Sequence, residues 1–257
     1  MKATLTVLGS GTSMGVPTIG CDCAVCHSSD PHDRRTRPSV LVEYGGKTVL
    51  IDSTPDFREQ AIREAIRKLD AVFYTHSHAD HILGLDDLRP LSYQHKPNKL
   101  PLYARPEAAD FIRNTFRYIF DADYKFGGLA QVELKSFHGP VDLFGARFEP
   151  IPVIHGDSQI DGFRFGNAAY LTDHSGVPEA SLAKLQNLDI LFLDALRHIP
   201  HPTHSTVENS LRIVERLQPK RAFFTHICHD LPHEATNATL PPNVRLSYDG
   251  MKLDFEI

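Results

Sequence analysis

The sequence lacks any apolar run that approaches the roughly 20 residues of a membrane-spanning helix. Its first residues, Met1–Gly9, are too short and alternate too regularly to form a signal peptide. The net charge is −5, so the chain has no general positive field that would attract nucleic acid. These absences predict a cytoplasmic protein without a membrane partner.

Cysteine is also scarce, and its four residues are unevenly placed. Cys21, Cys23 and Cys26 form a Cys-x-Cys-x-x-Cys cluster, whereas Cys228 lies far away along the chain. Without a secretion signal, such a cluster favours thiolates bound to a metal over disulfides. A structural zinc loop is therefore expected at about residues 20–30.

Zinc in a structural site takes four ligands, and the cluster supplies only three. Cys228 and His229 are neighbours in the sequence, and by chemistry either could supply the fourth ligand. His27 and His32 are weaker candidates for the same place. The residues by themselves leave this choice open.

No linker, low-complexity tract or compositional break divides the 257 residues, of which 41% are hydrophobic and 23% charged. Alternating or apolar segments predict strands at about residues 3–8, 39–44, 47–51, 71–75, 101–104, 131–137, 141–144, 147–154, 162–166, 168–172, 190–193, 222–224, 244–248 and 251–256. Helical periodicity and end signals predict helices at 55–69, 106–120, 178–188 and 205–217. This order predicts one α/β domain over residues 1–257, with two sheets covered by helices.

The motif that organises the chain is Thr75-His76-Ser77-His78-Ala79-Asp80-His81. It follows the apolar run 71–74, which is typical of a buried strand. Neutral imidazole and carboxylate are the ligands that zinc, manganese or iron accept. Four such groups this close together would repel one another once the histidines were protonated, so the motif predicts a bound cation.

Further residues of the same types recur where predicted strands end. His76, His155, Asp173 and His226 each follow or close a strand. Because the loops at one edge of a sheet converge in space, these side chains are expected to meet.

In this order, His-x-His-x-Asp-His followed by His155, Asp173 and His226 resembles the metallo-β-lactamase superfamily. The resemblance runs nearly end to end and implies an αββα four-layer sandwich with a dinuclear site at one edge of the sheets. It implies that one metal ion is held by His76, His78 and His155, a second by Asp80, His81 and His226, and that Asp173 bridges both.

Two other motifs narrow the resemblance. Gly9-Ser10-Gly11-Thr12-Ser13-x-Gly15-x-Pro17 with the cysteine cluster, and Thr225-His226-Ile227-x-His229, look like those of the phosphodiesterases of the bacterial phosphonate (carbon–phosphorus lyase) pathway. In that family a structural zinc is held by three cysteines and a histidine, which here would be Cys21, Cys23, Cys26 and His229.

That family is similar to the tRNA 3′-processing endonucleases, which carry a motif like His204-Ser205-Thr206. Those enzymes insert a tRNA-binding arm between the third metal histidine and the bridging aspartate. Here only 17 residues, 156–172, separate His155 from Asp173. This spacing and the acidic net charge argue against nucleic-acid substrates larger than cyclic nucleotides.

Several polar residues near these motifs are expected to assist the metals. His204 is interpreted as the general acid, or as a donor to the transition-state oxygen, and Asp80 as catalytic besides its metal role. Asp52 and Asp194 are expected to orient metal histidines. His174 is expected either to contact the metal ligands without binding metal itself or to be exposed. His198 and His201 are expected to be exposed loop residues.

The resulting hypothesis is a dinuclear hydrolase of a small phosphodiester, such as a cyclic ribose phosphate or cyclic nucleotide, with two zinc or manganese ions and one structural zinc. A hydroxide held between the two ions would attack phosphorus in line with the leaving oxygen, which His204 would protonate. The alternatives are an RNA-processing nuclease, a thioesterase, a di-iron redox protein, which His78 disfavours, and a non-catalytic metal-binding accessory protein.

Two segments carry weaker expectations. Backbone N–H groups of the loop 9–15 could hold a phosphate oxygen. The aromatic segment 111–126 is expected to pack in the core, with a substrate lid or dimer contact as the alternative. A homodimer is suggested by the resemblance alone.

Overall fold

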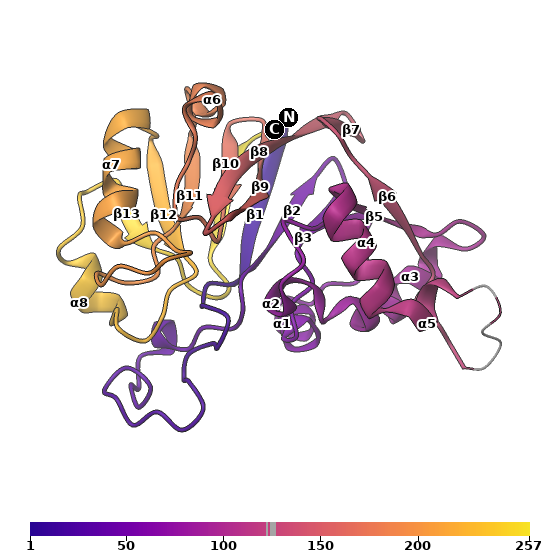
Figure 1. Cartoon of the computed structure of the whole chain (residues 1–257), viewed down its shortest axis with the longest axis horizontal. Coiled ribbons are helices and arrows are strands. Elements are labelled where there is room, and N and C mark those ends of the chain that lie inside the picture. The colour runs from indigo at the N-terminus through magenta and orange to yellow at the C-terminus, as the bar shows by residue number, and fades with distance from the viewer. Residues whose placement is uncertain (122, 124–126) are drawn as a thin grey trace.

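Two seven-stranded sheets pack face to face in the computed structural model, which describes residues 1–121, 123 and 127–257 (Figure 1). The first sheet has the order β14-β1-β2-β3-β4-β5-β6, with β1 Lys2–Gly9, β2 Ser39–Tyr44, β3 Lys47–Ile51, β4 Ala71–Phe73, β5 Leu100–Ala104, β6 Val132–Ser136 and β14 Lys252–Glu256. The second has the order β13-β12-β11-β10-β9-β8-β7, with β7 Val141–Leu143, β8 Ala146–His155, β9 Ser158–Phe165, β10 Ala168–Leu171, β11 Ile190–Asp194, β12 Arg221–Thr225 and β13 Val244–Leu246.

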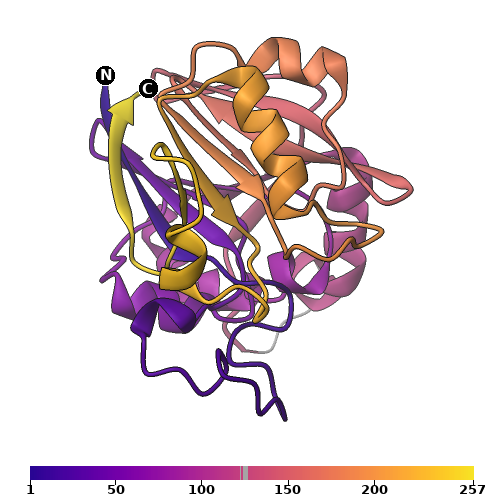
Figure 2. The same cartoon turned by 90° about the vertical axis from the view of Figure 1, so that its left-hand side faces the viewer.

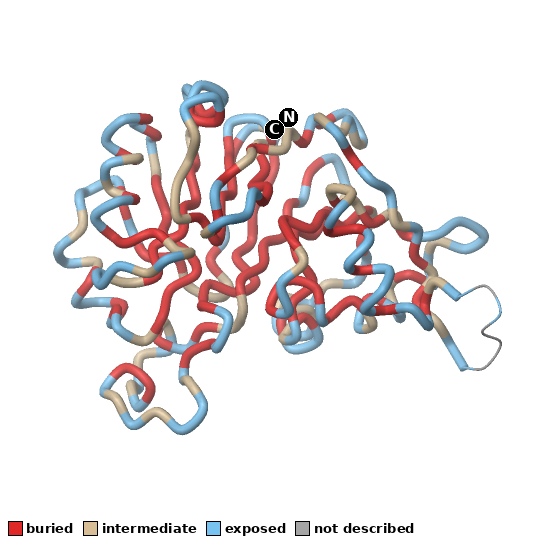
Figure 3. The backbone as a smooth tube through the Cα atoms, viewed as in Figure 1, coloured by how far each residue is buried: buried red, intermediate tan, exposed pale blue. Residues whose placement is uncertain are grey.

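Helices cover the outer faces of both sheets, so the predicted αββα sandwich is confirmed. The first sheet is covered by α1 Phe57–Arg63, α2 Ala79–Ile82, α3 Arg89–Ser92, α4 Pro106–Thr115 and α5 Arg117–Phe120, and the second by α6 Glu179–Leu182, α7 Val207–Leu217 and α8 His233–Asn237. Short 3-10 helices are η1 Pro31–Asp33, η2 Leu85–Leu88, η3 Tyr93–His95 and η4 Ala183–Leu185. One aromatic-rich core fills the space between the sheets, and buried residues follow the strands in Figure 3.

None of the helices among the described residues combines the length and the apolar character that a membrane crossing requires. The longest described helix, α7, is short and amphipathic, with Thr206 accepting from the Asn209 N–H at its start. Its N-cap is Thr206, so the helix begins two residues after the predicted start at 205.

The predicted helix 55–69 is too long by about two turns. α1 ends at Arg63, because Ala65 takes a left-handed conformation with φ of 53°. The Ala65 N–H donates to the Ile62 carbonyl and the Ile66 N–H to the Ala61 carbonyl, which is a Schellman motif. The apolar spacing of 57–69 concealed this end, since no glycine marks it.

Other differences are also local. The predicted helix 178–188 is a short α-helix followed by a 3-10 turn, and β9 begins four residues before the strand predicted at 162–166. α8 and the short helices of residues 79–95 were not predicted, because segments this short carry little periodicity.

The aromatic segment divides between core and surface. Phe116 is buried against the first sheet, whereas Phe111 is 52% exposed and Tyr118 is 40% exposed. Tyr124 and Phe126 lie outside the described residues. The core interpretation therefore holds for Phe116 but not for the whole group.

Strand direction determines where the polar loops meet. β3 and β4 are parallel neighbours in one sheet, and β10, β11 and β12 are parallel in the other. The loops after these strands therefore leave the same edge of the sandwich. The N-terminal loop 10–38 lies at this end too, as the indigo segment at the bottom of Figures 1 and 2.

Three consecutive N–H groups of the glycine- and hydroxyl-rich loop 9–15 connect chain segments that are distant in sequence. The Ser10 N–H donates to Asp249 Oδ1, the Gly11 N–H to the Thr36 carbonyl and the Thr12 N–H to the Ile227 carbonyl, at 2.9, 2.8 and 3.1 Å. These donors are satisfied within the protein, so they do not support the expected phosphate contact.

Asp249 joins three segments that are distant in sequence. Its carboxylate accepts from the backbone and the hydroxyl of Ser10 and of Thr36, and it lies 3.3 Å from Arg63 Nη1. We expect Asp249→Ala to lower the free energy of unfolding by about 2–3 kcal/mol, because several inward-facing donors would lose a charged acceptor.

Urea unfolding of the purified variant measures this change. Asp254→Ala is the matched control, since the Asp254 carboxylate accepts from the Thr4 hydroxyl at an exposed position and its removal should change stability by about 0.5 kcal/mol or less. Equal effects of both substitutions would contradict the role of Asp249.

Candidate metal centre

The histidine motif spans the end of β4 and the first turn of α2. His76 follows the strand, His78 precedes the helix, and Asp80 and His81 lie in its single turn. Asp173 and His226 come after β10 and β12 and have positive φ values of 54° and 57°. Such a conformation is uncommon for residues other than glycine and is found often at functional sites.

One group of potential ligands consists of imidazoles alone. His76, His78 and His155 each offer a nitrogen, and these atoms lie within 4.8 Å of one another. His155 Nε2 lies 3.3 Å from His78 Nδ1. His76 and His155 are buried, whereas His78 is exposed, so this group faces the solvent on one side.

A second group is buried throughout and contains both carboxylates. His81 Nε2 lies 3.3 Å from Asp80 Oδ2 and 3.3 Å from Asp173 Oδ1. His226 Nε2 lies 3.5 Å from Asp80 Oδ2 and 3.2 Å from Asp173 Oδ2. Asp173 Oδ2 also lies 3.9 Å from His76 Nε2, so this carboxylate reaches both groups.

The donor set fits divalent metal ions. Four buried atoms that point into these groups have no hydrogen-bond partner among the described residues: His76 Nε2, Asp80 Oδ2, His81 Nε2 and His226 Nε2. Buried polar atoms are almost always paired, so a cluster of unpaired imidazole nitrogens and carboxylate oxygens is what a metal site requires.

Opposite charges in the second group offset the cost of burial. Burial alone would raise the pKa of Asp80 and of Asp173. The neighbouring histidines outweigh this effect, so the pKa of each carboxyl lies below its ordinary value. Burial lowers the pKa of His226, but Asp173 and Asp80 raise it to about 9. Metal binding requires neutral imidazoles, so a cation must displace these protons when it binds.

Further residues orient the candidate ligands by hydrogen bonds to the Nδ1 atoms of two of the histidines. The His81 Nδ1–H donates to Asp52 Oδ2 at 2.8 Å, and Asp52 is held by the backbone and hydroxyl of Thr75, both at 2.9 Å. Asp52 therefore lies where the sequence interpretation placed it. The His155 Nδ1–H donates to the Thr203 carbonyl at 2.9 Å, a contact that carries no side-chain signal in the sequence.

His204 lies beside the ligands without belonging to either group. Its ring stacks on His226 with 4.5 Å between the centroids, and its Nδ1–H donates to Asp194 Oδ2 at 2.7 Å. The sequence predicted that Asp194 would orient a metal histidine. In the structure it contacts His204 instead. Burial and the neighbouring His226 lower the pKa of His204 to about 4.

The other histidines differ in their surroundings. His174 is fully buried, not exposed, and neither ring nitrogen has a hydrogen-bond partner among the described residues. His198 is exposed, as expected, and pairs with Glu208 at 2.6 Å. His201 is partly buried, with its ring 5.1 Å from that of His204, so it is not the free loop residue that was expected.

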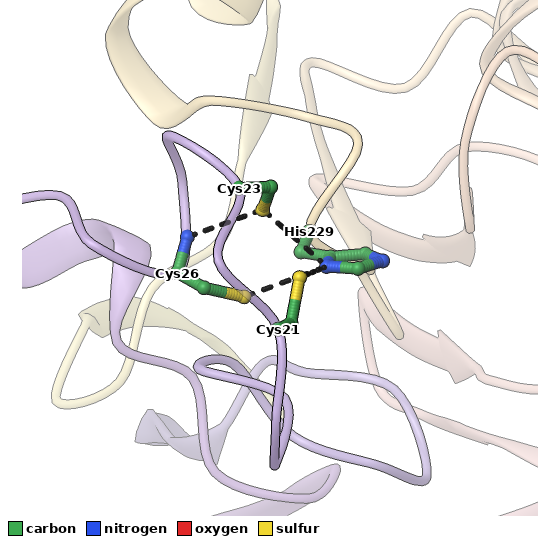
Figure 4. A group of neighbouring side chains, drawn as sticks. All are labelled: Cys21, Cys23, Cys26 and His229. Carbon is green, nitrogen blue, oxygen red and sulfur yellow. Dashed lines mark hydrogen bonds between the residues drawn. The ribbon is translucent and has the colours of Figure 1, made fainter.

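The three clustered cysteines surround His229 (Figure 4). The Nδ1 of His229 lies 3.1 Å from Cys21 Sγ, 3.5 Å from Cys23 Sγ and 3.4 Å from Cys26 Sγ. This geometry fits a tetrahedral zinc site with one imidazole and three thiolates.

The thiols differ in their readiness to bind metal. The Cys26 N–H donates to Cys23 Sγ, which lowers the pKa of Cys23 to about 6 and favours the thiolate. Burial raises the pKa of Cys228 to about 12, and its thiol pairs with Asp230 instead. The pairing of Cys228 with Asp230 and the contacts of His229 with the three clustered thiols favour His229 over Cys228 as the fourth ligand.

Arg35 ties this region to the loop that carries His226. Its guanidinium is buried and donates to the carbonyls of Cys228 at 2.8 Å and Leu231 at 2.7 Å, and it pairs with Asp33 at 3.0 Å. The cysteine loop and the loop after β12 are therefore held together by the hydrogen bonds of Arg35 as well as by the cysteine–histidine cluster.

Comparison with known proteins gives the same family from sequence and from structure. Residues 47–227 match the beta-lactamase superfamily domain. A solved structure described as a diphosphatase from the PhnP family is 62% identical to this chain and superposes with a TM-score of 0.94, over 99% of this chain and 98% of that one.

Two curated relatives match over part of their length. An octanoyltransferase of Porphyromonas gingivalis is 37% identical over 251 residues, which cover 96% of this chain and 50% of that protein. A ribonuclease Z of Bradyrhizobium diazoefficiens is 27% identical over 150 residues, which cover 55% of this chain and 48% of that protein. The chain thus spans about half the length of these curated relatives.

We expect Cys23→Ala to remove a single zinc ion per chain and to lower the melting temperature, because a structural zinc contributes directly to folding. Inductively coupled plasma mass spectrometry of the purified protein measures the zinc content. Cys228→Ala is the matched control and should retain all of the zinc. Loss of the same zinc from Cys228→Ala as well as from Cys23→Ala would make Cys228 the fourth ligand, and unchanged zinc in Cys23→Ala would rule the site out.

Proposed function

Since the chain belongs to the beta-lactamase superfamily and, within it, to the PhnP family, we propose that it is a metal-dependent hydrolase of small phosphodiesters. The observation that carries this proposal is the pair of ligand groups connected by Asp173, with His204 beside them. Phosphate esters are cleaved efficiently by sites that hold two cations close together.

In this proposal each ligand group holds one divalent ion, zinc or manganese. His76, His78 and His155 would hold the first ion, Asp80, His81 and His226 would hold the second, and Asp173 lies between the two groups. When bound, the ions supply Lewis-acid chemistry, which activates water and offsets the negative charge of a phosphate. Asp52 and Thr203 keep His81 and His155 in the orientation that this requires.

His204 serves the departing alcohol. Its Nδ1–H is held by Asp194, so the other ring nitrogen is free to meet the leaving oxygen of a substrate at the metal groups. When the ring carries a second proton, on that other nitrogen, Asp194 faces the resulting positive charge, and the N–H donates to the developing alkoxide and stabilises it. Asp80 reaches His81 and His226 from the same side and keeps their ring nitrogens directed at the site.

The surroundings of the site favour a small substrate. β8 and β9 are joined by a tight turn, with His155 paired to Ser158, and the chain then returns directly through β10 to Asp173. No arm that could hold a folded RNA extends from this described segment. This supports a cyclic ribose phosphate or cyclic nucleotide over tRNA, although a ribonuclease Z is among the relatives.

A second candidate is cleavage of a diphosphate bond, because the 62% identical protein is described as a diphosphatase. The same residues would serve either reaction, since both displace an oxygen from phosphorus. A thioesterase or a non-catalytic accessory protein is less well supported, because all seven ligands of the two groups are present.

The experiment is a substrate panel on the metal-loaded protein: an aryl phosphodiester, cyclic ribose phosphates, 2′,3′-cyclic nucleotides, a nucleoside diphosphate ester, pre-tRNA and a glutathione thioester. We expect the highest kcat/KM on a small phosphodiester and loss of activity after chelation, with recovery on adding Mn²⁺ or Zn²⁺. Asp173→Ala should lose nearly all activity. Hydrolysis of the thioester alone would overturn the proposal.

We expect His204→Ala to lower kcat about 10²–10⁴-fold while the metal content stays unchanged, because His204 acts on the leaving group and not on the ions. Steady-state kinetics and elemental analysis of the same preparation measure both. His198→Ala, on the same loop but paired with exposed Glu208, should keep wild-type kcat. Loss of metal from His204→Ala would make His204 a ligand instead.

A further inference from the structure

A third cluster of metal-binding side chains lies outside both sites described above. His32 in η1 and His233 and Glu234 in α8 each offer a ligand atom, and these atoms lie within 4.8 Å of one another. From these contacts we propose that His32, His233 and Glu234 form an additional zinc site that fastens the N-terminal loop to α8.

The two imidazoles come from segments about 200 residues apart and lie against each other. Their ring centroids are 4.6 Å apart, and the ring of Tyr248 lies 4.2 Å from His32 and 5.8 Å from His233. The tyrosine covers one side of the histidine pair. Its ring therefore packs against both imidazoles, whereas Glu234 is exposed.

The backbone at both histidines is held in place by aspartate carboxylates. The His32 N–H donates to Asp30 Oδ1 at 2.9 Å, and the His233 N–H donates to Asp33 Oδ1 at 2.9 Å. Asp33 also accepts from the buried guanidinium of Arg35 at 3.0 Å. This ion pair offsets the positive charge of Arg35 next to the cluster. The site is thus built before a ligand arrives.

His233 has an unpaired buried ring nitrogen, which stacking against His32 does not explain. The residue is only 4% exposed, and its Nδ1 is buried without a hydrogen-bond partner among the described residues. A buried nitrogen of this kind is costly unless an acceptor, a donor or a metal ion meets it. Asp30 Oδ1 lies 3.5 Å from His32 Nδ1, as in the carboxylate–histidine pairs that orient metal ligands.

Two imidazoles and one carboxylate are a ligand set that zinc accepts, with a further position left for water. Ligands of one zinc ion lie roughly 3–4 Å apart, because each ligand–zinc distance is about 2.0–2.2 Å. The exposed side chain of Glu234 is free to make the small movement that this needs. The ion would clamp the loop that carries the cysteines to the helix that follows His229 (Figures 1 and 2).

The test measures zinc content of the full-length protein at a series of buffered free Zn²⁺ concentrations. We expect His32→Ala and Glu234→Gln each to bind one zinc per chain fewer than the wild type at the concentrations where the last ion is bound. Glu234→Gln preserves size at an exposed position, so it remains informative if a histidine variant folds poorly. His27→Ala is the matched control, since the His27 side chain is exposed in the same loop and its imidazole pairs with the exposed Asp22.

Added Zn²⁺ should also raise the Tm of the wild type and of His27→Ala more than that of the two site variants, since a ligand stabilises only the state that binds it. Combining Glu234→Gln with Cys23→Ala should remove two zinc ions, which separates this site from the cysteine cluster. Equal zinc content in the wild type, His32→Ala and Glu234→Gln would overturn the proposal, as would loss of the same ion from His27→Ala.

Discussion

Charge balance inside the second ligand group is the constraint around which the site end of the molecule is arranged. Two buried carboxylates, Asp80 and Asp173, lie within 3.2–3.5 Å of two buried imidazoles. Removing a carboxylate from water costs of the order of several kcal/mol unless a positive charge or hydrogen bonds meet it. Protons on the imidazoles can supply that charge, but a divalent cation supplies it more completely, and this exchange links the local fold to metal binding.

Successive layers of hydrogen bonds keep these ligands in place. Asp52 and the Thr203 carbonyl each hold one candidate ligand, His81 and His155, and Asp194 holds His204. Farther out, Asp249 and Arg35 join the first loop of the chain to its C-terminal segments. The cysteine cluster and the proposed zinc site at α8 act at the same end of the sandwich, where regular structure is sparse and the loops need other support.

Sequence reasoning succeeded where residue type and periodicity carried the information. The αββα sandwich is confirmed, and Asp52 lies against His81 as interpreted from its place after a strand. It failed where the backbone decided the outcome. Helix 55–69 ends early because Ala65 adopts a left-handed conformation, and three N–H groups of the loop 9–15 donate to acceptors from residues 36, 227 and 249.

The sequence by itself determined which residues could bind metals, because histidine, cysteine and aspartate in these spacings have few other uses and the resemblance extends along the chain. Only the tertiary structure decided how they combine. It places His229, and not Cys228, against the clustered thiols, and it pairs Asp194 with His204. It also buries His174 and places His32 against His233, about 200 residues away in the sequence. These pairings depend on which strand edges and loops meet in space. The spacing of residues along the sequence does not give the distances between them in the fold.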